Sequence, residues 1–249
     1  MPPTQPLWPY PRWIAHRGAG RLAPENTLAA FRLGASHGYR MFECDAKLSA
    51  DEVVFLLHDA TLERTTNGHG TAAELSWHAL SQLDAGSWLS RAYAGEPLAT
   101  LSGLSRYCRA NGYLLNIEIK PSPGTDRRTG EVVAREAAAQ WRGAAVPPLL
   151  TSFRTQALEG ARETAPGLPR GLLIDNWHED AVATAHGLGC VALVCNYALW
   201  DAARVARARA AGLRCLSYTV NDASVAAHVL DLGTDGVITD RVDLFAPDA

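Results

Sequence analysis

The sequence predicts an α/β fold, a (β/α)₈ TIM barrel with a short insertion after its second strand. Short apolar runs rich in β-branched residues alternate with helical segments through nearly all of the 249 residues, which is typical of a parallel sheet covered by helices. About eight strand–helix units in a chain of this length fit a closed barrel, which forms one domain. The alternative, a doubly wound open sheet, is less favoured because "HRGAG" lacks the third glycine of a dinucleotide-binding turn. We therefore expect a single domain over residues 1–249.

The expected elements follow from local patterning. Strands are expected at Arg12–His16, Arg40–Asp45, Val53–His58, Tyr113–Ile119, Pro148–Ser152, Leu168–Ile174, Cys190–Cys195, Leu213–Thr219 and Gly236–Thr239. Helices are expected at Thr27–His37, Leu101–Asn111, Gly130–Trp141, Thr155–Thr164, Glu179–His186, Asp201–Ala211 and Ala223–Leu232. Several of these helices are followed by a glycine, the usual residue at a helix C-terminus. These glycines are Gly38, Gly112, Gly187, Gly212 and Gly233.

Residues 46–100 depart from the regular alternation. The link "KLSADE" between the second and third expected strands is too short for a helical crossover and therefore predicts a hairpin. The segment that follows has no clear periodicity, and long irregular segments usually cover a site or contribute to it. Its aromatic residues Trp77, Trp88 and Tyr93 are expected to pack locally, with the pocket mouth and a dimer contact as the alternatives.

Composition limits the function classes. The formal net charge is −3 and no Lys/Arg-rich run occurs, which argues against nucleic acid as the main partner. No apolar run approaches the ~20 residues of a membrane span, and "MPPTQPLWPYPRW" does not have the pattern of a signal peptide. The five cysteines form no C-x-x-C pair and are expected to be free thiols. These observations predict a cytoplasmic protein without membrane insertion; a homo-oligomer remains open.

Polar residues gather where the first strands end, which is where barrel enzymes carry their chemistry. The residues in these positions are His16, Arg17, Glu43, Asp45, His58, Glu118 and Lys120. Glu43 and Asp45 are two residues apart, as are Glu118 and Lys120, so each pair projects from one face of its strand. Taken alone, Glu118 and Lys120 would be interpreted as a structural ion pair. Because the other polar residues also lie at strand ends, a functional site is favoured.

The types of these residues suggest a chemistry. Three converging carboxylates, Glu43, Asp45 and Glu118, repel one another unless a hard divalent cation such as Mg²⁺ or Ca²⁺ lies between them. His16 and His58 suit proton transfer near neutral pH. Arg17 and Lys120 suit an anionic oxygen. This set points to phosphate-ester chemistry. The other six histidines are expected at the surface: His37, His69, His78, His178, His186 and His228.

Longer motifs carry a resemblance to a known family. "AHRGAGRLAPENTLAAF", "FECDAKLSADEVVFLLHDATLERTTNGHG" and "NIEIK" resemble the glycerophosphodiester phosphodiesterase family, and "TSF", "YTVND" and "GTDGVITDRVDLF" agree with it later in the chain. The resemblance covers residues 12–245 and is closest to compact bacterial cytosolic members. It departs from the family pattern at Ala46, where Val is frequent, at Glu52, where Gly is frequent, and at Tyr218, where Trp is frequent.

The resemblance implies a metal-dependent hydrolysis of glycerophosphodiesters to sn-glycerol 3-phosphate and an alcohol. It implies that His16 and His58 are catalytic, that Arg17 and Lys120 contact the phosphate, and that one Mg²⁺ or Ca²⁺ ion is held by carboxylates. Those carboxylates are Glu43, Asp45 and Glu118.

The loop after the first expected strand has its own expectations. Gly18 and Gly20 are expected to let the backbone turn closely over the phosphate. Asn26 or Thr27 is expected to cap the first helix, while Glu25 and Asn26 are equally well placed to orient a site residue.

Several alternatives stay open at this stage. One histidine would accept a proton from the nucleophile while the other protonates the leaving alkoxide, with no assignment between them. The nucleophile is either water or the neighbouring glycerol hydroxyl, which would give a cyclic phosphate. A phospholipase D-like enzyme acting on lysophospholipids is the alternative enzyme. A phosphometabolite sensor and a structural protein are weaker alternatives, because neither explains the full set of polar residues.

Overall fold

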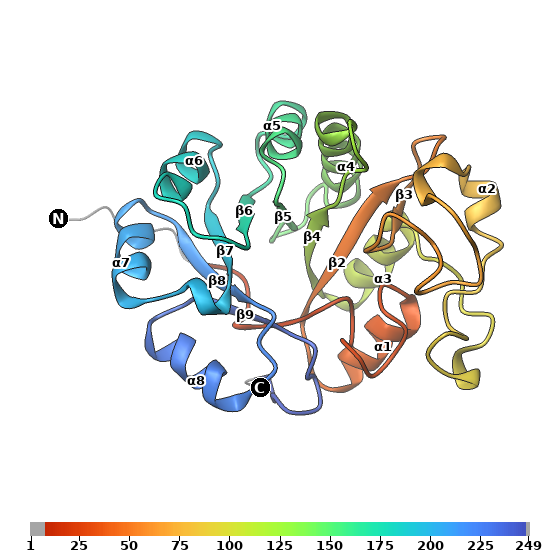
Figure 1. Cartoon of the computed structure of the whole chain (residues 1–249), viewed down its shortest axis with the longest axis horizontal. Helices are drawn as coiled ribbons and strands as arrows, with labels where there is room; N and C mark the ends of the chain where they lie inside the picture. The colour runs from red at the N-terminus through yellow and green to blue at the C-terminus, as the bar shows by residue number, and fades with distance from the viewer. Residues whose placement is uncertain (1–7, 248–249) are drawn as a thin grey trace.

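A computed structural model describes residues 8–247, so the first seven residues of the N-terminal segment lie outside it. Eight parallel strands close into a barrel in the order β1-β9-β8-β7-β6-β5-β4-β2, and β2 pairs back onto β1 (Figure 1). The strands are β1 (Trp13–Ala15), β2 (Met41–Leu48), β4 (Leu114–Ile119), β5 (Leu149–Ser152), β6 (Arg170–Ile174), β7 (Ala192–Asn196), β8 (Arg214–Tyr218) and β9 (Gly236–Thr239). The predicted (β/α)₈ barrel is confirmed.

Helices cover the outside of the barrel (Figure 1). They are α1 (Leu28–Ser36), α3 (Leu101–Asn111), α4 (Asp126–Gln140), α5 (Thr155–Thr164), α6 (Ala181–Gly187), α7 (Ala202–Ala210) and α8 (Ala223–Asp231). Gly112 takes the left-handed conformation that ends α3. Gly187 instead lies inside α6, and Gly189 has the positive φ there, so that predicted stop was placed two residues early.

Helix α4 begins at Asp126, whereas the sequence predicted a start at Gly130. Its first turn has no apolar periodicity, and a tertiary contact stabilises it: Arg154 Nε donates to Asp126 Oδ1 at 2.5 Å. Gly130 lies where α4 meets α5, and a Cβ there would be 2.0 Å from the Ala157 carbonyl oxygen. Gly130 therefore permits close helix packing and does not mark a helix start.

Strand alternation separates the core from the site. On β2, Phe42, Cys44 and Ala46 point outward into the large core cluster between the barrel and the helices. Met41 packs with the apolar side chains of the barrel interior, and the carboxylates of Glu43 and Asp45 share this inner face because side chains alternate along a strand. The same strand thus supplies the core with one face and the barrel mouth with the other.

The insertion after β2 has its own small core. Strand β3 (Val54–Leu56) runs antiparallel to the end of β2, as the hairpin prediction required. The expected irregular segment contains the 3₁₀ turns η1 (Ala72–Glu74) and η2 (Arg91–Tyr93) and the short helix α2 (Trp77–Leu80). Trp77 packs against Phe55, with ring centroids 6.3 Å apart. These short elements escape a periodicity analysis because they are shorter than one amphipathic repeat.

The cysteines and the lengths of the helices can be compared with the predictions from composition. The five cysteines all lie in the described part of the chain, where they are free and buried. Among residues 8–247, no helix combines the length and the apolar character needed to cross a membrane.

Candidate active site

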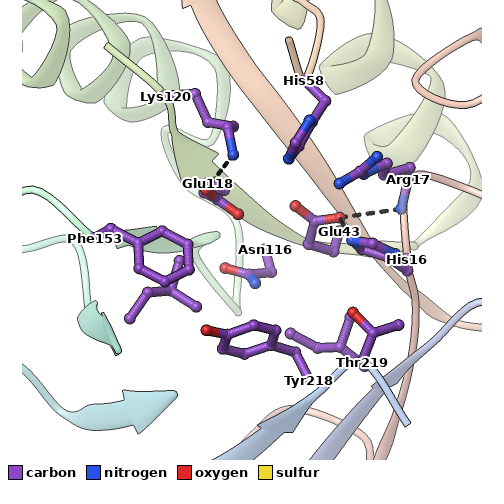
Figure 2. Close-up of a pocket in the computed structure, with 12 residues that line it drawn as sticks. His16, Arg17, Glu43, His58, Asn116, Glu118, Lys120, Phe153, Tyr218 and Thr219 are labelled. Atoms are coloured by element: carbon purple, nitrogen blue, oxygen red, sulfur yellow. Dashed lines mark hydrogen bonds and ion pairs between the residues drawn. The ribbon is translucent and has the colours of Figure 1, made fainter. Parts of the chain in front are cut away.

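The barrel brings all seven predicted site residues together at the C-terminal ends of its strands. Six of them line a cavity of about 140 Å³, and Asp45 lies fully buried beside them (Figure 2). The six are His16, Arg17, Glu43, His58, Glu118 and Lys120. We call this cavity the inner pocket. The other six histidines are all exposed, as expected from their sequence contexts.

Strand register explains how the three carboxylates meet. Glu43 pairs with Asn116 and Asp45 pairs with Glu118 across β2 and β4, so the carboxylates occupy neighbouring inward positions. One oxygen from each of Glu43, Asp45 and Glu118 lies within 4.8 Å of the others. Their clustering in the barrel mouth is therefore a direct result of the parallel pairing of two strands.

Burial and mutual repulsion perturb these carboxylates strongly. Burial, reinforced by the charge of Asp45, raises the pKa of Glu43 to about 8, and the same two causes raise the pKa of Glu118. Burial also acts against ionisation of Asp45, but the charges of Arg17 and Lys120 outweigh it and lower its pKa to about 2. The cluster thus contains one firmly ionised carboxylate, Asp45, and two carboxylates, Glu43 and Glu118, whose ionisation is opposed by burial and by repulsion from Asp45.

The donor set fits a hard divalent cation. Glu43 Oε1 and Asp45 Oδ1 are buried and accept no hydrogen bond from the described residues. Buried carboxylate oxygens without a partner are costly. Oxygen ligands from carboxylates, completed by water or substrate, are those that Mg²⁺ and Ca²⁺ prefer. The geometry is therefore compatible with one such ion between Glu43, Asp45 and Glu118.

His16 is oriented by a partner at the other end of the chain. Its Nδ1 lies 2.6 Å from Asp240 Oδ1, and Asn221 Nδ2 donates to Asp240 Oδ2 at 2.8 Å. Because an ionised carboxylate only accepts hydrogen bonds, Nδ1 carries a proton and Nε2 is left for the pocket, 3.8 Å from Glu43 Oε2. Burial alone would lower the pKa of His16, but the hydrogen bond to Asp240 and the charge of Glu43 outweigh it and raise this pKa.

His58 also has a carboxylate partner at Nδ1, but its pKa is lowered, not raised. Its Nδ1 lies 2.7 Å from Asp59 Oδ1, so its Nε2 is likewise the free nitrogen. Burial lowers the pKa of His58, and the charge of Asp45, which acts the other way, does not compensate because Arg17 and Lys120 add positive charge. At a pH between these two pKa values, His16 is protonated while His58 is neutral. The pocket therefore offers a proton donor and a proton acceptor at the same pH.

Carboxylates surround the Arg17 side chain. Its Nη1 donates to Glu25 Oε1 at 2.9 Å, and its Nε lies 3.1 Å from Asp45 Oδ2. Its backbone N–H donates to Glu43 Oε2 at 3.0 Å, as Figure 2 shows. Arg17 has a φ of 51°, an unfavourable value for a side-chain-bearing residue. Such strain is tolerated where the surrounding structure enforces it.

Lys120 lies beside Glu118, on the side of the carboxylates away from Arg17 (Figure 2). Its Nζ lies 3.1 Å from Glu118 Oε1 and 3.8 Å from Asp45 Oδ1. The ammonium group also lies 6.0 Å from the centroid of the Phe153 ring. The Glu118–Lys120 ion pair exists, and it is part of the pocket lining.

In the loop between β1 and α1, adjacent residues have different roles. Thr27 caps α1 by accepting a hydrogen bond from the Ala30 N–H at 3.3 Å. Asn26 instead binds Asp45 at both ends: its Nδ2 donates to Asp45 Oδ2 at 2.8 Å, and its Oδ1 accepts from the Asp45 N–H at 3.1 Å. Asn26 has a φ of 61°. It therefore orients a site carboxylate and does not cap the helix.

The glycines of this loop have packing reasons. Gly20 has a φ of 57°, and a Cβ there would lie 2.2 Å from the Cα and the carbonyl oxygen of Asp240. A Cβ at Gly18 would lie 2.8 Å from backbone atoms at the start of α1. Close packing therefore explains both glycines without a phosphate. Gly18 lets the loop approach α1, and Gly20 lets it approach Asp240, which orients His16.

Sequence reasoning did not assign several residues of the site. Asp240 directly follows β9, so the strand-end rule that found the other residues applied to it as well. Asn116 lines the pocket from β4 and accepts a hydrogen bond from Thr151 Oγ1 at 3.0 Å. Phe153 and Tyr218 form an apolar wall, edge to face with centroids 5.8 Å apart.

Comparisons with known proteins indicate the family of this chain. Residues 16–244 match the model of the glycerophosphoryl diester phosphodiesterase family. The structure is similar to that of an Oleispira antarctica phosphodiesterase in complex with the product sn-glycerol-3-phosphate, with a TM-score of 0.86, 33% identity and coverage of 92% of this chain and 93% of that one. A glycerophosphodiester phosphodiesterase from Caldanaerobacter subterraneus is 29% identical over 236 residues, which are 91% of this chain and 93% of that protein.

A further solved structure, a glycerophosphodiester phosphodiesterase from Agrobacterium tumefaciens, has a TM-score of 0.79 at 27% identity and covers 95% of this chain and 99% of that one. The family model extends from the first site histidine to the loop beyond Asp240, so it includes every site residue described above. The predicted resemblance is thereby confirmed: the chain belongs to the glycerophosphoryl diester phosphodiesterase family.

Proposed function

We propose that this chain hydrolyses glycerophosphodiesters to sn-glycerol 3-phosphate and an alcohol. The observation that carries the proposal is one pocket lined by two histidines with opposite pKa shifts, two cations and members of a carboxylate cluster. The product-bound Oleispira relative supports it. Two of the relatives described above are named for glycerophosphodiesters and none for a lysophospholipid, so they lend no support to a lysophospholipid substrate.

Glu43, Asp45 and Glu118 would hold one Mg²⁺ or Ca²⁺ ion. When bound, the ion supplies positive charge that offsets the phosphodiester charge and stabilises the transition state. Glu43 Oε1 and Asp45 Oδ1, which are buried and accept no hydrogen bond from the described residues, support this assignment.

Arg17 and Lys120 bind the non-bridging oxygens of the phosphate, Arg17 through its guanidinium fork and Lys120 as a point charge. Both side chains already lie beside carboxylates, which keep them oriented before substrate enters. Phe153 and Tyr218 exclude water from one side of the pocket and contact the carbons of the glycerol arm.

His58 and His16 divide the proton transfers. Neutral His58 accepts the proton of the attacking hydroxyl as its oxygen bonds to phosphorus. Protonated His16 donates its Nε2 proton to the leaving alkoxide as the second phosphorus–oxygen bond breaks. With water as nucleophile the products form in one displacement; with the neighbouring glycerol hydroxyl a cyclic phosphate forms first, and water opens it in a second step. In each displacement one histidine gains a proton from the nucleophile and the other loses one to the leaving oxygen. In the second step of the cyclic route the roles of His16 and His58 are reversed, which restores their starting protonation states.

The test is release of sn-glycerol 3-phosphate by the purified protein from a panel of glycerophosphodiesters and a lysophospholipid, with Mg²⁺, with Ca²⁺ and with EDTA. We expect metal-dependent release from the diesters. His16→Ala and His58→Ala should each lower kcat by about 10²–10⁴-fold. His178→Ala is a matched control, because His178 makes the same Nδ1–carboxylate contact, at 2.7 Å to Asp180, but is exposed and outside the pocket. Turnover near wild type in either site variant would contradict the scheme.

A further inference from the structure

A second hollow adjoins the inner pocket. His16 and Arg17 line both; in Figure 2 they stand on the side of the inner pocket opposite Phe153. The hollow, which we call the outer pocket, has a volume of about 500 Å³. Its further walls come from the loop after β1, with Arg21, and from the insertion, with Arg64 and Trp88. The insertion thus contributes to a cavity beside the proposed reaction centre.

We propose that the outer pocket binds the leaving alcohol of the diester, and that Trp88 and Arg21 select an alcohol that carries several hydroxyl groups and no positive charge. This inference rests on the proposed function, which it deepens by naming a substrate class. Trp88 and Arg21 are specificity-determining residues in this scheme and take no part in proton transfer.

The sizes of the two pockets decide which arm of the diester each receives. A phosphodiester carries two arms on one phosphorus, and a phosphate held at His16 and Arg17 lies on the boundary between the pockets. The inner pocket, at about 140 Å³, has room for the phosphate and a three-carbon glycerol unit against Phe153 and Tyr218. The outer pocket is more than three times larger. It therefore suits the arm that differs from one diester to another.

Trp88 presents a rigid apolar surface to the outer pocket. Its side chain is 38% exposed although it is a large aromatic residue, and its Nε1 donates to the Ala85 carbonyl at 2.9 Å, which fixes the ring. The surrounding turn is held by Asp84, whose side chain accepts from the N–H groups of Gly86, Ser87 and Gly95. An aromatic face held in advance suits the C–H surface of a polyol ring and costs little ordering on binding.

The charges of the outer pocket favour hydroxyl groups over a cation. Arg21 is exposed and makes no ion pair or hydrogen bond with any residue in 8–247, so its guanidinium can donate to a substrate hydroxyl. Arg17 and Arg64 bring two more guanidinium groups to the same lining. The carboxylates are already engaged: Glu25 binds Arg17 and Arg64, and Asp240 binds His16 and Asn221.

A quaternary ammonium group in the outer pocket would therefore meet the guanidinium groups of Arg17, Arg21 and Arg64 and no free carboxylate. Attraction to the Trp88 ring is the only compensation the lining offers it. A hydroxyl group, in contrast, both accepts from arginine and tolerates the engaged carboxylates nearby.

The experiment compares glycerophosphoinositol with glycerophosphocholine, measuring sn-glycerol 3-phosphate release at saturating metal. We expect the wild-type protein to hydrolyse both and to prefer the inositol diester. Arg21→Ala should lower kcat/KM for the inositol diester about tenfold, chiefly through KM, and should not lower it for the choline diester. Trp88→Ala should lower kcat/KM for both diesters, because the indole face contacts the polyol ring and also attracts a quaternary ammonium group. Trp88→Phe keeps an aromatic face and should lose less, and it substitutes for the alanine variant if that variant fails to fold.

Two matched controls remove the same side chains elsewhere. Arg91→Ala lies in the insertion but outside both pockets, and Trp177→Ala removes an indole that packs on Arg204; neither should alter the preference. Equal losses on both substrates in Arg21→Ala, or a larger loss on the choline diester in that variant, would overturn the proposal, as would an unchanged kcat/KM for the inositol diester in Trp88→Ala. Wild-type release from both diesters would still uphold the proposed function in that case, whereas no release from either would refute both.

Discussion

Arg64 donates two hydrogen bonds to Asp59, from Nε to Oδ2 at 2.5 Å and from Nη2 to Oδ1 at 3.1 Å. Asp59 in turn lies 2.7 Å from His58 Nδ1. The same guanidinium binds both oxygens of Glu25 at 2.8 Å, and Glu25 binds Arg17. One arginine of the insertion therefore supports both a histidine and a phosphate-binding cation of the proposed mechanism, without lining the inner pocket itself.

Replacing Arg64 should impair turnover by loosening these supports. We expect Arg64→Gln to lower kcat by roughly 10–100-fold, because small displacements of reacting groups have effects of this size. kcat should fall for every diester. Arg64→Lys should restore little, since an ammonium group cannot make two bidentate contacts. Steady-state kinetics on two diesters measures this. Arg128→Gln, which removes a bidentate pair with Glu52 on the outer surface, is the control; an unchanged kcat in Arg64→Gln would contradict the support role.

The opposite pKa shifts of the two histidines predict a bell-shaped pH dependence of kcat/KM. His58 acts while neutral, and burial holds its pKa below the ordinary 6.5, so activity falls only as pH drops through that lowered value. His16 acts while protonated; its hydrogen bond to Asp240 outweighs burial and raises its pKa above 6.5, so activity falls as pH rises through that higher value. A profile at saturating metal tests this, and a profile that rises or falls throughout would refute the assignment.

Asp240 should control the alkaline limb of that profile. Asp240→Asn removes the negative charge that raises the pKa of His16 against its burial, and it leaves one oxygen where two now serve His16 and Asn221. The alkaline limb should therefore move to lower pH, and kcat should fall about 10–100-fold, as is usual when the partner that orients a functional histidine is lost. Asp243→Asn is a nearby control, because Asp243 pairs only with exposed Arg241 among the described residues. A kcat loss without any shift of the limb would argue for a purely structural role.

Glu43 links the metal to stability. Burial raises its pKa to about 8, far above the value of an unfolded chain. Its ionised form therefore costs stability above the unfolded pKa, and this cost grows until the pH reaches the folded pKa. Glu43→Gln should thus raise the melting temperature in EDTA at pH 7, while the amide oxygen can still accept from the Arg17 N–H.

The same variant should lose its response to metal. In the wild-type protein, Mg²⁺ or Ca²⁺ at 100 times its Kd should add about 2.7 kcal/mol, which is roughly 5–10 °C for a chain of this size. Thermal melts with EDTA and with each metal measure both effects, and Glu74→Gln on the exposed surface is the control. A full metal response in Glu43→Gln would exclude Glu43 as a ligand.

Asn26 offers a test of how the site is held before any substrate binds. Asn26→Gly leaves the buried Asp45 N–H without its acceptor, which should cost about 1–3 kcal/mol in the free energy of unfolding. Asn26→Ala should cost roughly 1 kcal/mol more, because alanine must also adopt the φ of 61°. Urea denaturation of both variants separates the two contributions. Equal losses would show that the backbone conformation carries no strain.

Local patterning accounts for what was predictable here. Alternation along Met41–Leu48 and the strand-to-helix order through the chain are local properties, so they indicate the barrel without a structure. The rule that barrels carry their chemistry at strand ends then selects the seven predicted residues. The insertion was less predictable: its short elements are stabilised by packing onto Phe55 and Leu62, which no repeat in the sequence reveals.

The partners of those residues, by contrast, depend on closure of the barrel. His16 and Asp240 are 224 positions apart and meet because β1 pairs with β9. Arg64 reaches Glu25 because the insertion packs beside the start of α1, where Glu96 also accepts from the Ala29 N–H. Sequence alone thus determines which side chains point inward at which strand ends, since side-chain alternation is a local property of the backbone. The protonation states and supports of those side chains arise only when long-range strand pairing encloses them together, because pKa values depend on burial and on charges distant in the chain.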